Sequence, residues 1–485
     1  MAFLWPIVLA LVDDAVLARI ATRGSADVMI HLAAPLSLDT LELDSSLPRT
    51  FRREAVHRHL LAQAEASQEG MRTTLARLGV PFTPFWISNA IAVRPLPAAA
   101  LQALTQAHAA EIARIKLIGM HRRLGPTALR QAPLAKSVGA LGEDAQWNIK
   151  LVAAPEAWAA GANGSGVVVA TLDGGVSYKH EALVDGYRGS LGGGKYSHDY
   201  NWKDWPYKHK APDDDDGHGT NVQGIATASR GYGVAPGARW FTGKIFNFAG
   251  YSADDWTLGG CQFAMCPTPV DATTPENCSL GADVVSNSWG EDDATTDFLK
   301  PVVAAWLKAG IVPVFAVGNA GPTCSTSVSP SDYAGVLAVG ATDHGDQICP
   351  FSSRGPAANG TSGPIPYSPL APSIVAPGLS IAGPSYKGEG YTDFSGTSQA
   401  APHVAGAAAV LLSASPSGLD GPPSPAEVAA ALYKAAATAS LKEPDRGKDT
   451  CGNVAWSTFP NFIYGNGRLD VYAALAEMRS SHTLG

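Results

Sequence analysis

From Trp147 onward, short runs of apolar and mostly β-branched residues recur along the chain. They are GVVVATLD, ARWFTGKIF, ADVVSNSWG, IVPVFAVGN, VLAVGATD and PSIVAPG. Stretches with the apolar spacing of helices, such as VQGIATAS and FLKPVVAAWLKAG, separate several of these runs. Apolar strands that alternate with helices are typical of a parallel sheet covered by helices on both faces. We therefore predict an α/β domain over residues 147–480, with its functional residues at the carboxyl ends of the strands.

The region before Trp147 has a different pattern. The alternation typical of strands occurs in residues 26–33 and 84–96. The apolar spacing of helices occurs in residues 51–79 and 97–115. This order predicts a small α+β domain over residues 26–118. Residues 119–146 mix Gly, Pro, Arg and Ser without a period, which predicts a linker.

Composition limits the range of functions. The chain has 485 residues, 46% hydrophobic and 16% charged, which suffices for two or three globular domains. A net charge of −8 argues against a nucleic-acid partner. Residues 1–146 carry 15 Lys+Arg and 12 Asp+Glu, a net +3, whereas the remainder carries −11. This asymmetry favours two complementary units, although ordinary variation in charge would also explain it.

The N-terminus and the cysteines indicate a secreted, extracellular protein. The run MAFLWPIVLALV has the length of a signal-peptide core and is too short to span a bilayer, so we predict a signal peptide over residues 1–18; a truncated start is the alternative. No other segment has the length of a membrane span, so no membrane partner is expected. Three Asn-x-Ser/Thr sequons, at Asn163, Asn277 and Asn359, favour a glycoprotein.

Six cysteines fit the same oxidising compartment. Cys261, Cys266 and Cys278 are clustered, and the other three are scattered. We expect at least two disulfides, one of which involves the cluster. If all six cysteines are oxidised, a cluster of three needs an outside partner, and Cys324 is the first choice. The cluster fits no zinc spacing, and no HExxH occurs, so no metal ligands are assigned.

An acidic run leaves the question of calcium open. Asp213, Asp214, Asp215 and Asp216 could bind the ion, but the loop lacks an EF-hand pattern, and we prefer a solvated acidic loop. No cofactor is therefore expected to be required.

Three segments far apart in the sequence each contain one residue of a catalytic triad. Asp173 ends VVVATLD, His218 lies in DDGHGTNVQG, and Ser398 lies in SGTSQAAPHVAG. A serine hydroxyl needs a base to take its proton, and an imidazole needs a carboxylate to fix its tautomer. Taken singly, these residues have ordinary explanations as a turn aspartate, a loop histidine and an N-cap serine. The prediction of a catalytic triad rests on the occurrence of all three segments in one chain.

The same segments suggest how an oxyanion would be stabilised. Ser398 is predicted at the start of a long apolar helix, with Pro402 in its first turn, so free N–H groups are available there. Asn319 in FAVGNAGP follows a predicted strand, and its amide could complete an oxyanion hole with the Ser398 N–H. A turn asparagine is the alternative.

From about Trp147 to Leu475 the chain resembles the subtilisin-like serine peptidases. The resemblance rests on the three triad segments in the order Asp, His, Ser, on SNSWG, on FSSRGP and on the closing YGNGRLDVYAAL. The insert GGCQFAMCPTPVD is similar to the bacillopeptidase F-like branch, and residues 26–118 are similar to the inhibitory propeptides of the family. The propeptide resemblance implies a processing site in the linker over residues 119–146. The resemblance implies triad roles for Asp173, His218 and Ser398 and an oxyanion role for Asn319. It also implies a substrate cleft lined by Ser288, Trp289, Gly290, Ala316, Val317 and Gly318.

Three residues depart from the family pattern. Gly174 stands where Thr or Ser is usual, Asn221 where His is usual and Gln399 where Met is usual. None of these removes a catalytic group, so they affect the expected rate and specificity more than the reaction.

The predicted function is therefore that of a secreted serine endopeptidase made as a zymogen. Its partners would be peptide substrates and its own propeptide, and it would act as a monomer. A lipase or esterase would need G-x-S-x-G and the order Ser, Asp, His, whereas the segment here is GTSQA. A peptide-binding protein without activity is the other alternative, and the presence of all four catalytic groups argues against it.

Overall fold

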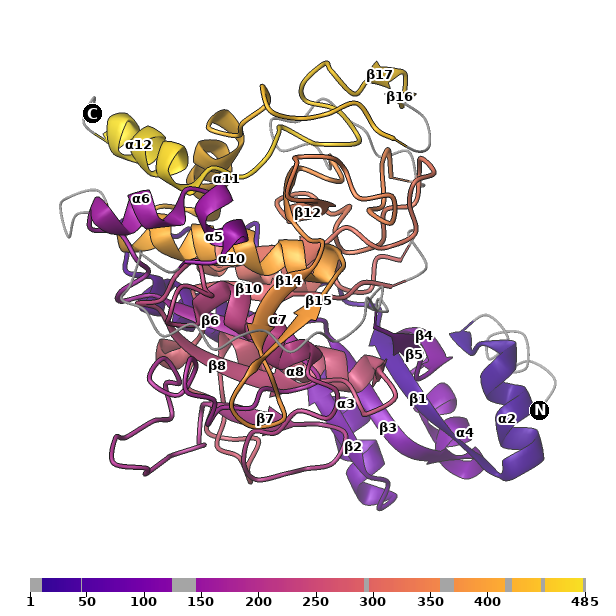
Figure 1. The fold of residues 1–485 in the computed structure, drawn as a ribbon. Helices are drawn as coiled ribbons and strands as arrows, with labels where there is room; N and C mark the ends of the chain where they lie inside the picture. The colour runs from indigo at the N-terminus through magenta and orange to yellow at the C-terminus, as the bar shows by residue number, and fades with distance from the viewer. Residues whose placement is uncertain are drawn as a thin grey trace.

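Two main sheets organise the molecule (Figure 1). The computed structural model describes residues 11–44, 46–123, 145–291, 296–357, 370–414, 421–445 and 450–482. One sheet belongs to the region before Trp147 and the other to the region after it.

The larger sheet has seven strands in the order β13-β12-β11-β10-β6-β8-β7, and all its pairings are parallel. Its strands are β6 (Val168–Asp173), β7 (Trp202–Asp204), β8 (Arg239–Lys244), β10 (Val284–Asn287), β11 (Val312–Ala316), β12 (Leu337–Thr342) and β13 (Ile374–Pro377). All strands except the short edge strand β7 lie within the six apolar runs of the sequence, so the predicted α/β class is confirmed.

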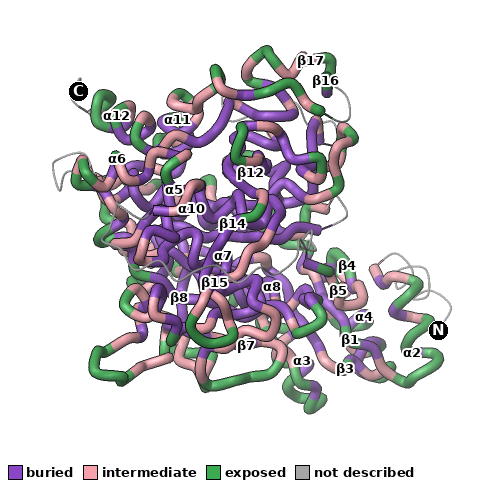
Figure 2. Tube along the Cα trace, in the orientation of Figure 1, coloured by how far each residue is buried: buried purple, intermediate pink, exposed green. Residues whose placement is uncertain are grey.

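Helices cover both faces of this sheet. On one face, side chains such as Val169, Val284 and Val314 share a core with α10 (Thr397–Ser413), α11 (Pro425–Lys434) and α12 (Val471–His482). On the other face, the neighbouring residues in the strands share a core with α8 (Asp254–Met265) and α9 (Lys300–Ala309). Because successive strand residues point to opposite faces, continuous apolar runs fill both cores. Figure 2 shows the buried strands at the centre and exposed residues mostly in peripheral loops and helix ends.

Helix α10 packs closely because it is rich in small residues. A Cβ on Gly406 would lie 2.8 Å from the carbonyl oxygen of Ala226 in α7 (His218–Thr227). Pro402 lies inside this helix and not in its first turn as predicted. Because proline has no N–H, the carbonyl of Ser398 lacks its helical partner. That carbonyl accepts a hydrogen bond from the Ser288 hydroxyl instead, at 2.7 Å.

The leading region forms an antiparallel sheet in the order β2-β3-β1-β4. Its elements are α2 (Asp14–Arg23), β1 (Ser25–Leu32), α3 (Arg49–Arg77), β2 (Phe82–Phe85), β3 (Ala90–Pro97), α4 (Ala98–Ala107) and β4 (Ile112–Leu117). We call residues 11–123 the leading module, which includes the short strand that follows β4. The predicted helix over 97–115 is wrong in its second half, where Ile112 and Ile115 belong to β4. Their spacing of three residues fits a helix, but both side chains are buried against β1.

Helix α2 overlaps the end of the predicted signal peptide. Val12 and Val16 are buried in the core of the leading module, together with Ile30 and Ile115. Residues 1–10 lie outside the described residues, and the boundary at residue 18 stays a prediction.

The leading module packs on α8 and α9. Val56, Leu60 and Phe85 share a core with Leu258 and Trp306 of these helices. The chain then forms β5 (Met120–Arg122), which pairs antiparallel with β9 (Tyr251–Ala253). The predicted linker therefore begins with a strand. Residues 124–144 of that linker lie outside the described residues.

The remaining elements complete the larger domain. They are α5 (Trp147–Leu151), α6 (Ala154–Ala159), the 3-10 helix η1 (Cys278–Leu280), β14 (Ile381–Pro384) paired with β15 (Tyr391–Phe394), and β16 (Thr450–Cys451) paired with β17 (Val454–Ala455). Among the described residues, no helix combines the length and the apolar character needed to cross a bilayer.

Two disulfides are present, Cys266–Cys278 and Cys324–Cys451. This confirms the expectation of at least two disulfides with one involving the cluster. The choice of Cys324 as the partner of the cluster is wrong, because Cys324 pairs with Cys451 and Cys261, the third cysteine of the cluster, is a free thiol. Cys261 and Cys349 are buried thiols, and burial raises the pKa of both.

Candidate active site

Asp173 and His218 meet where β6 ends and α7 begins. Neither side chain is exposed, and His218 Nδ1 lies 2.9 Å from Asp173 Oδ1 and 3.0 Å from Oδ2. Gly219 permits this approach, since a Cβ there would lie 2.1 Å from the carbonyl oxygen of Gly175. The contact places a proton on Nδ1 and leaves Nε2 to accept one. Nε2 is buried and has no hydrogen-bond partner among the described residues, so it is available as a base.

Ser398 is the second residue of α10 and is fully buried. Its hydroxyl donates to the carbonyl of Ser288 at 3.1 Å, and the Ser288 hydroxyl donates to the Ser398 carbonyl. These two bonds join the segment after β10 to the start of α10. The Ser398 hydroxyl must leave the Ser288 carbonyl before a base can take its proton.

The segments that carry Ser398 and His218 are joined by the residues that depart from the family pattern. Gln399 follows Ser398, and Asn221 lies one helical turn after His218. Gln399 Nε2 donates to Asn221 Oδ1 at 3.2 Å, and Asn221 Nδ2 donates to the Thr392 carbonyl at 3.2 Å. Each of the two unusual residues thus supplies a hydrogen-bond partner for the other.

Asn319 lies three residues after β11, and Thr397 orients its amide. Asn319 Oδ1 accepts from the Thr397 N–H and from the Thr397 hydroxyl, both at 2.9 Å. A Cβ on Gly396 would lie 3.4 Å from Asn319 Nδ2 and 3.6 Å from the Ser398 nitrogen. The two nitrogens therefore lie close to one point, which Gln399 Oε1 also approaches, at 3.1 Å. Two N–H donors in such an arrangement can stabilise an oxyanion.

The predicted cleft residues Ser288, Trp289 and Gly290 follow β10. Trp289 is 3% exposed, stacks edge-on against Phe315 and donates to the Leu172 carbonyl at 2.9 Å, so its side chain belongs to the core. A Cβ on Gly290 would lie 2.3 Å from Val328 Cγ2. The protein's own packing therefore requires glycine at this position.

Ala316, Val317 and Gly318 end β11 and continue the chain toward Asn319. Ala316 and Val317 are fully buried, and a Cβ on Gly318 would lie 2.7 Å from Ser353 Oγ. Contact of these residues with a substrate, like that of Ser288 to Gly290, stays a prediction.

The acidic run is only partly the solvated loop that we preferred, because the side chains of Asp213, Asp215 and Asp216 are about one third exposed and also form ion pairs. Lys244 Nζ lies 3.2 Å from Asp213 Oδ1 and 2.8 Å from Asp215 Oδ2. Asp214 accepts from the N–H and hydroxyl of Thr220, and burial, reinforced by Asp216, raises its pKa to about 6. These contacts tie the run to β8 and α7.

Arg123 is a residue of the site that the sequence did not indicate. Its side chain is 6% exposed, Nη1 lies 3.3 Å from Asp173 Oδ1, and Nη2 pairs with Asp216. Burial by itself lowers the pKa of Arg123, but Asp173 and Asp216 outweigh it and raise the pKa above its ordinary value. The dipeptide Arg122-Arg123 was the only sequence signal, and nothing in the sequence placed it beside Asp173.

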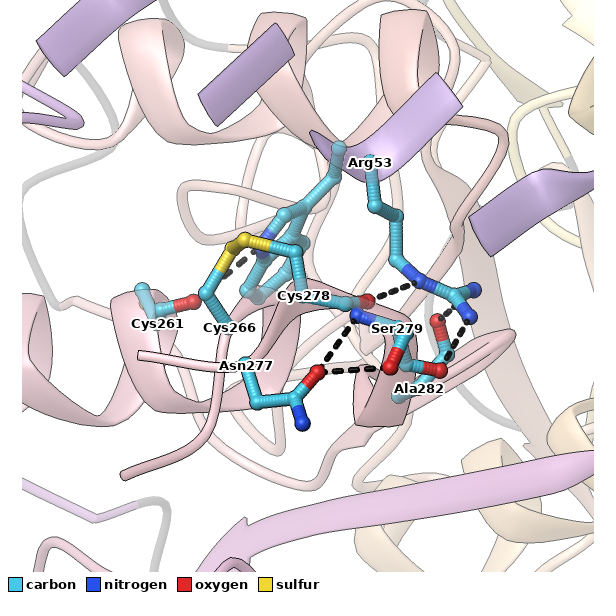
Figure 3. Close-up of a disulfide and its surroundings, with 8 residues drawn as sticks. Arg53, Cys261, Cys266, Asn277, Cys278, Ser279 and Ala282 are labelled. Atoms are coloured by element: carbon cyan, nitrogen blue, oxygen red, sulfur yellow. Dashed lines mark hydrogen bonds between the residues drawn. A yellow bond between two sulfur atoms is a disulfide. The ribbon is translucent and has the colours of Figure 1, made fainter. Parts of the chain in front are cut away.

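Helix α3 of the leading module contacts the chain just after the Cys266–Cys278 disulfide, where Arg53 lies close to Cys278, Ser279 and Ala282 (Figure 3). Arg53 donates to the carbonyls of Cys278 at 2.9 Å and Ala282 at 3.1 Å, and to the Asp283 carboxylate at 3.0 Å. Its side chain is 3% exposed. Burial lowers the pKa of Arg53, and Asp283 opposes this effect. We call Cys278, Ser279, Ala282 and Asp283 the Arg53 site.

Comparison with known protein families places the chain in one of them. The model of the Subtilase family matches residues 164–467, a range that contains Asp173, His218, Asn319 and Ser398. The chain therefore belongs to the subtilase family of serine-type hydrolases. The predicted resemblance is confirmed.

Three relatives show the extent of the similarity. The chain is 35% identical to bacillopeptidase F of Bacillus subtilis (strain 168) over 292 residues, which are 56% of this chain and 19% of that protein. It is 32% identical to subtilisin E of the same strain over 276 residues, 56% of this chain and 61% of that protein. It is 31% identical to a subtilisin of Bacillus pumilus over 276 residues, 56% of this chain and 85% of that protein. The matched region thus spans only part of bacillopeptidase F and of subtilisin E.

Proposed function

We propose that the chain is a secreted serine endopeptidase, made as a zymogen, that hydrolyses peptide bonds through Asp173, His218 and Ser398. The observation that carries the proposal is the buried Asp173–His218 contact, which leaves His218 Nε2 without a partner among the described residues. The Gln399–Asn221 hydrogen bond supports it, because it links the residues next to Ser398 and one turn after His218.

In this mechanism the Ser398 hydroxyl turns from the Ser288 carbonyl to His218 Nε2. His218 takes the proton while Ser398 Oγ attacks the carbonyl carbon of the peptide bond, and Asp173 stabilises the imidazolium. Asn319 Nδ2 and the Ser398 N–H hold the oxyanion. His218 then gives the proton to the leaving amine, and water hydrolyses the acyl-enzyme by the same route.

The leading module would act as an inhibitor and folding template that the enzyme removes. Its contacts at the Arg53 site and the pairing of β5 with β9 support this role, as does Arg123 beside Asp173. A parallel sheet of long-range pairs folds slowly, so a template that stabilises its formation would help. The alternative is an accessory domain that stays attached.

Secretion is supported by the two disulfides, which persist in oxidising compartments. Peptides are the substrates that the family membership favours.

Replacement of the nucleophile tests the proposal. We expect Ser398→Ala to reduce kcat about a millionfold, to abolish labelling by a fluorophosphonate and to keep the leading module attached. Ser413→Ala is the matched control, because this serine lies at the end of the same helix and its side-chain hydrogen bonds among the described residues are with Val410 and Gly164. It should label, hydrolyse peptides and lose the leading module as the wild type does.

A tenth of the wild-type turnover in folded Ser398→Ala would refute the assignment of the nucleophile. A wild-type enzyme that is active while it keeps an uncut leading module would refute the zymogen. Absence of labelling in wild type would favour the peptide-binding alternative.

A further inference from the structure

The end of the leading region runs along β9 and reaches Asp173; we call the surface that residues 119–123 cover the groove. Residues Met120, His121 and Arg122 pair antiparallel with Ala253, Ser252 and Tyr251. The next N–H, of Arg123, donates to the Gly250 carbonyl at 2.7 Å. The chain is thus held in extended form up to a residue whose side chain touches Asp173.

The Arg123 side chain occupies a position formed by carboxylates, an aromatic ring and a glycine. Asp173 and Asp216 contact the guanidinium, which also lies 5.9 Å from the ring centroid of Phe246. Gly174 makes room for it, because a Cβ there would lie 3.3 Å from Arg123 Nη1. The residue that departs from the family pattern after the triad aspartate therefore lies directly beside this arginine.

The His121 side chain occupies a second acidic position. His121 Nε2 lies 2.5 Å from Asp254 Oδ1, and Asp254 Oδ2 lies 2.8 Å from the Gly119 nitrogen and 3.1 Å from Lys116 Nζ. The Asp254 side chain is completely buried. All partners of this carboxylate among the described residues belong to residues 116–121.

Both positions lose their cations if the leading region departs. Asp216 then loses its guanidinium, and Asp254 loses every partner named above. Side chains two residues apart in an extended chain point to the same side, so a peptide in the same groove can satisfy both carboxylates at once. Arg122, between them, points to the other side.

We propose that the enzyme selects substrates with basic side chains at two positions, two residues apart, on the amino side of the cleaved bond. Asp216, Asp173 and Phe246 bind the side chain at the Arg123 position, and Asp254 binds the one at the His121 position. This inference rests on the proposed endopeptidase activity and adds a substrate class to it. It also places the self-processing cut within two residues after Arg123.

A set of quenched fluorescent peptides with the sequence of residues 116–127 tests the proposal with the mature enzyme released from the full chain. The Arg123 position carries Arg, Ala or Glu, and the His121 position carries Lys, His, Ala or Glu. We expect kcat/KM to fall about 10- to 100-fold from basic residue to Ala at either position, and further with Glu. The same changes at the Arg122 position are the control and should alter kcat/KM by less than about threefold.

Two enzyme variants assign each position to its carboxylate. Asp254→Asn should abolish the preference at the His121 position and retain it at the Arg123 position, and Asp216→Asn should weaken the preference at the Arg123 position alone. Each preference is the ratio of the kcat/KM values of two peptides on one enzyme, so differences in the active fraction of the enzyme cancel. If a variant does not fold, the peptide series on the wild-type enzyme still tests whether basic side chains are preferred at the two positions.

A wild-type enzyme that cleaves the Ala, Glu and basic peptides within threefold of one another refutes the specificity and leaves the proposed function intact. A wild-type protein that takes up no fluorophosphonate and cleaves no peptide refutes the proposed function and this inference with it.

Discussion

Replacing Arg53 should weaken the binding of the leading module to the rest of the protein without changing the residues of the groove. Its buried guanidinium makes three hydrogen bonds of 3.1 Å or less, to two carbonyls and Asp283. Removing one partner of a buried charge pair costs about 2–5 kcal/mol. We expect the loss of binding free energy in Arg53→Ala to lie at the lower end of this range, about 2–3 kcal/mol. The reason is that Arg49 also contacts Asp283, at 3.1 Å, and keeps that carboxylate paired. The inhibition constant of the leading module should therefore rise about 30- to 150-fold.

The assay is inhibition of the mature enzyme by a purified leading module, residues 11–123, with a peptide substrate. Arg58→Ala is the matched control, because Arg58 is an exposed arginine on the same helix. Its removal should change the inhibition constant by about twofold or less. Equal inhibition constants for Arg53→Ala and wild type would show that the Arg53 site does not hold the module in solution. An equal loss in Arg58→Ala would show that net charge, and not the buried contact, determines binding.

Two further predictions concern the reaction and its dependence on pH. Asn319→Ala should lower kcat about 10²- to 10³-fold with KM nearly unchanged, because one oxyanion donor is lost, and a kcat within threefold of wild type would remove Asn319 from the site. Burial lowers the pKa of His121, but the Asp254 hydrogen bond and Glu291 outweigh burial and the opposing Lys116, so the pKa in the complex lies above the ordinary 6.5. The His121 contribution to inhibition is therefore complete below pH 6.5 and is lost as the pH rises through the raised pKa, so that the inhibition constant of the leading module should increase in that range. His121→Arg keeps the charge and should remove this increase; an unchanged profile would exclude His121 as its cause.

The sequence predicted the elements whose signal is local. Each apolar run from GVVVATLD to PSIVAPG contains enough residues to mark a strand buried on both faces, and the structure has a strand in each. Strand β4 was missed because Ile112 and Ile115 are spaced as on a helix and only the pairing with β1 decides between the two. The partner of the cysteine cluster was wrong for a similar reason, since spacing does not determine which sulfurs meet.

The residues of the candidate site also differ in whether their sequence signal is local. The segments around Asp173, His218 and Ser398 have local patterns that place them at a strand end and at helix starts. Arg123 and Asp254 have no such pattern, because their importance arises from contacts between segments far apart in the chain, such as His121 and Asp254 at a separation of 133 residues. Gly174 and Gln399 were visible as departures from the family pattern. Only the structure relates the first to the room for Arg123 and the second to a partner for Asn221.

The contacts of the leading region fall into two groups that a mutation can separate. The Arg53 site begins at Cys278, where the loop closed by the disulfide ends, and a peptide in the groove would not replace Arg53 there. Asp216 and Asp254 lie where His121 and Arg123 enter the groove, and a basic substrate would compete for the same carboxylates. In the proposed function, changes at Arg53 should therefore alter inhibition and leave cleavage preference unchanged. Changes at Asp216 or Asp254 should alter both in the same direction, since one pair of carboxylates would serve the inhibitor before processing and the substrate after it.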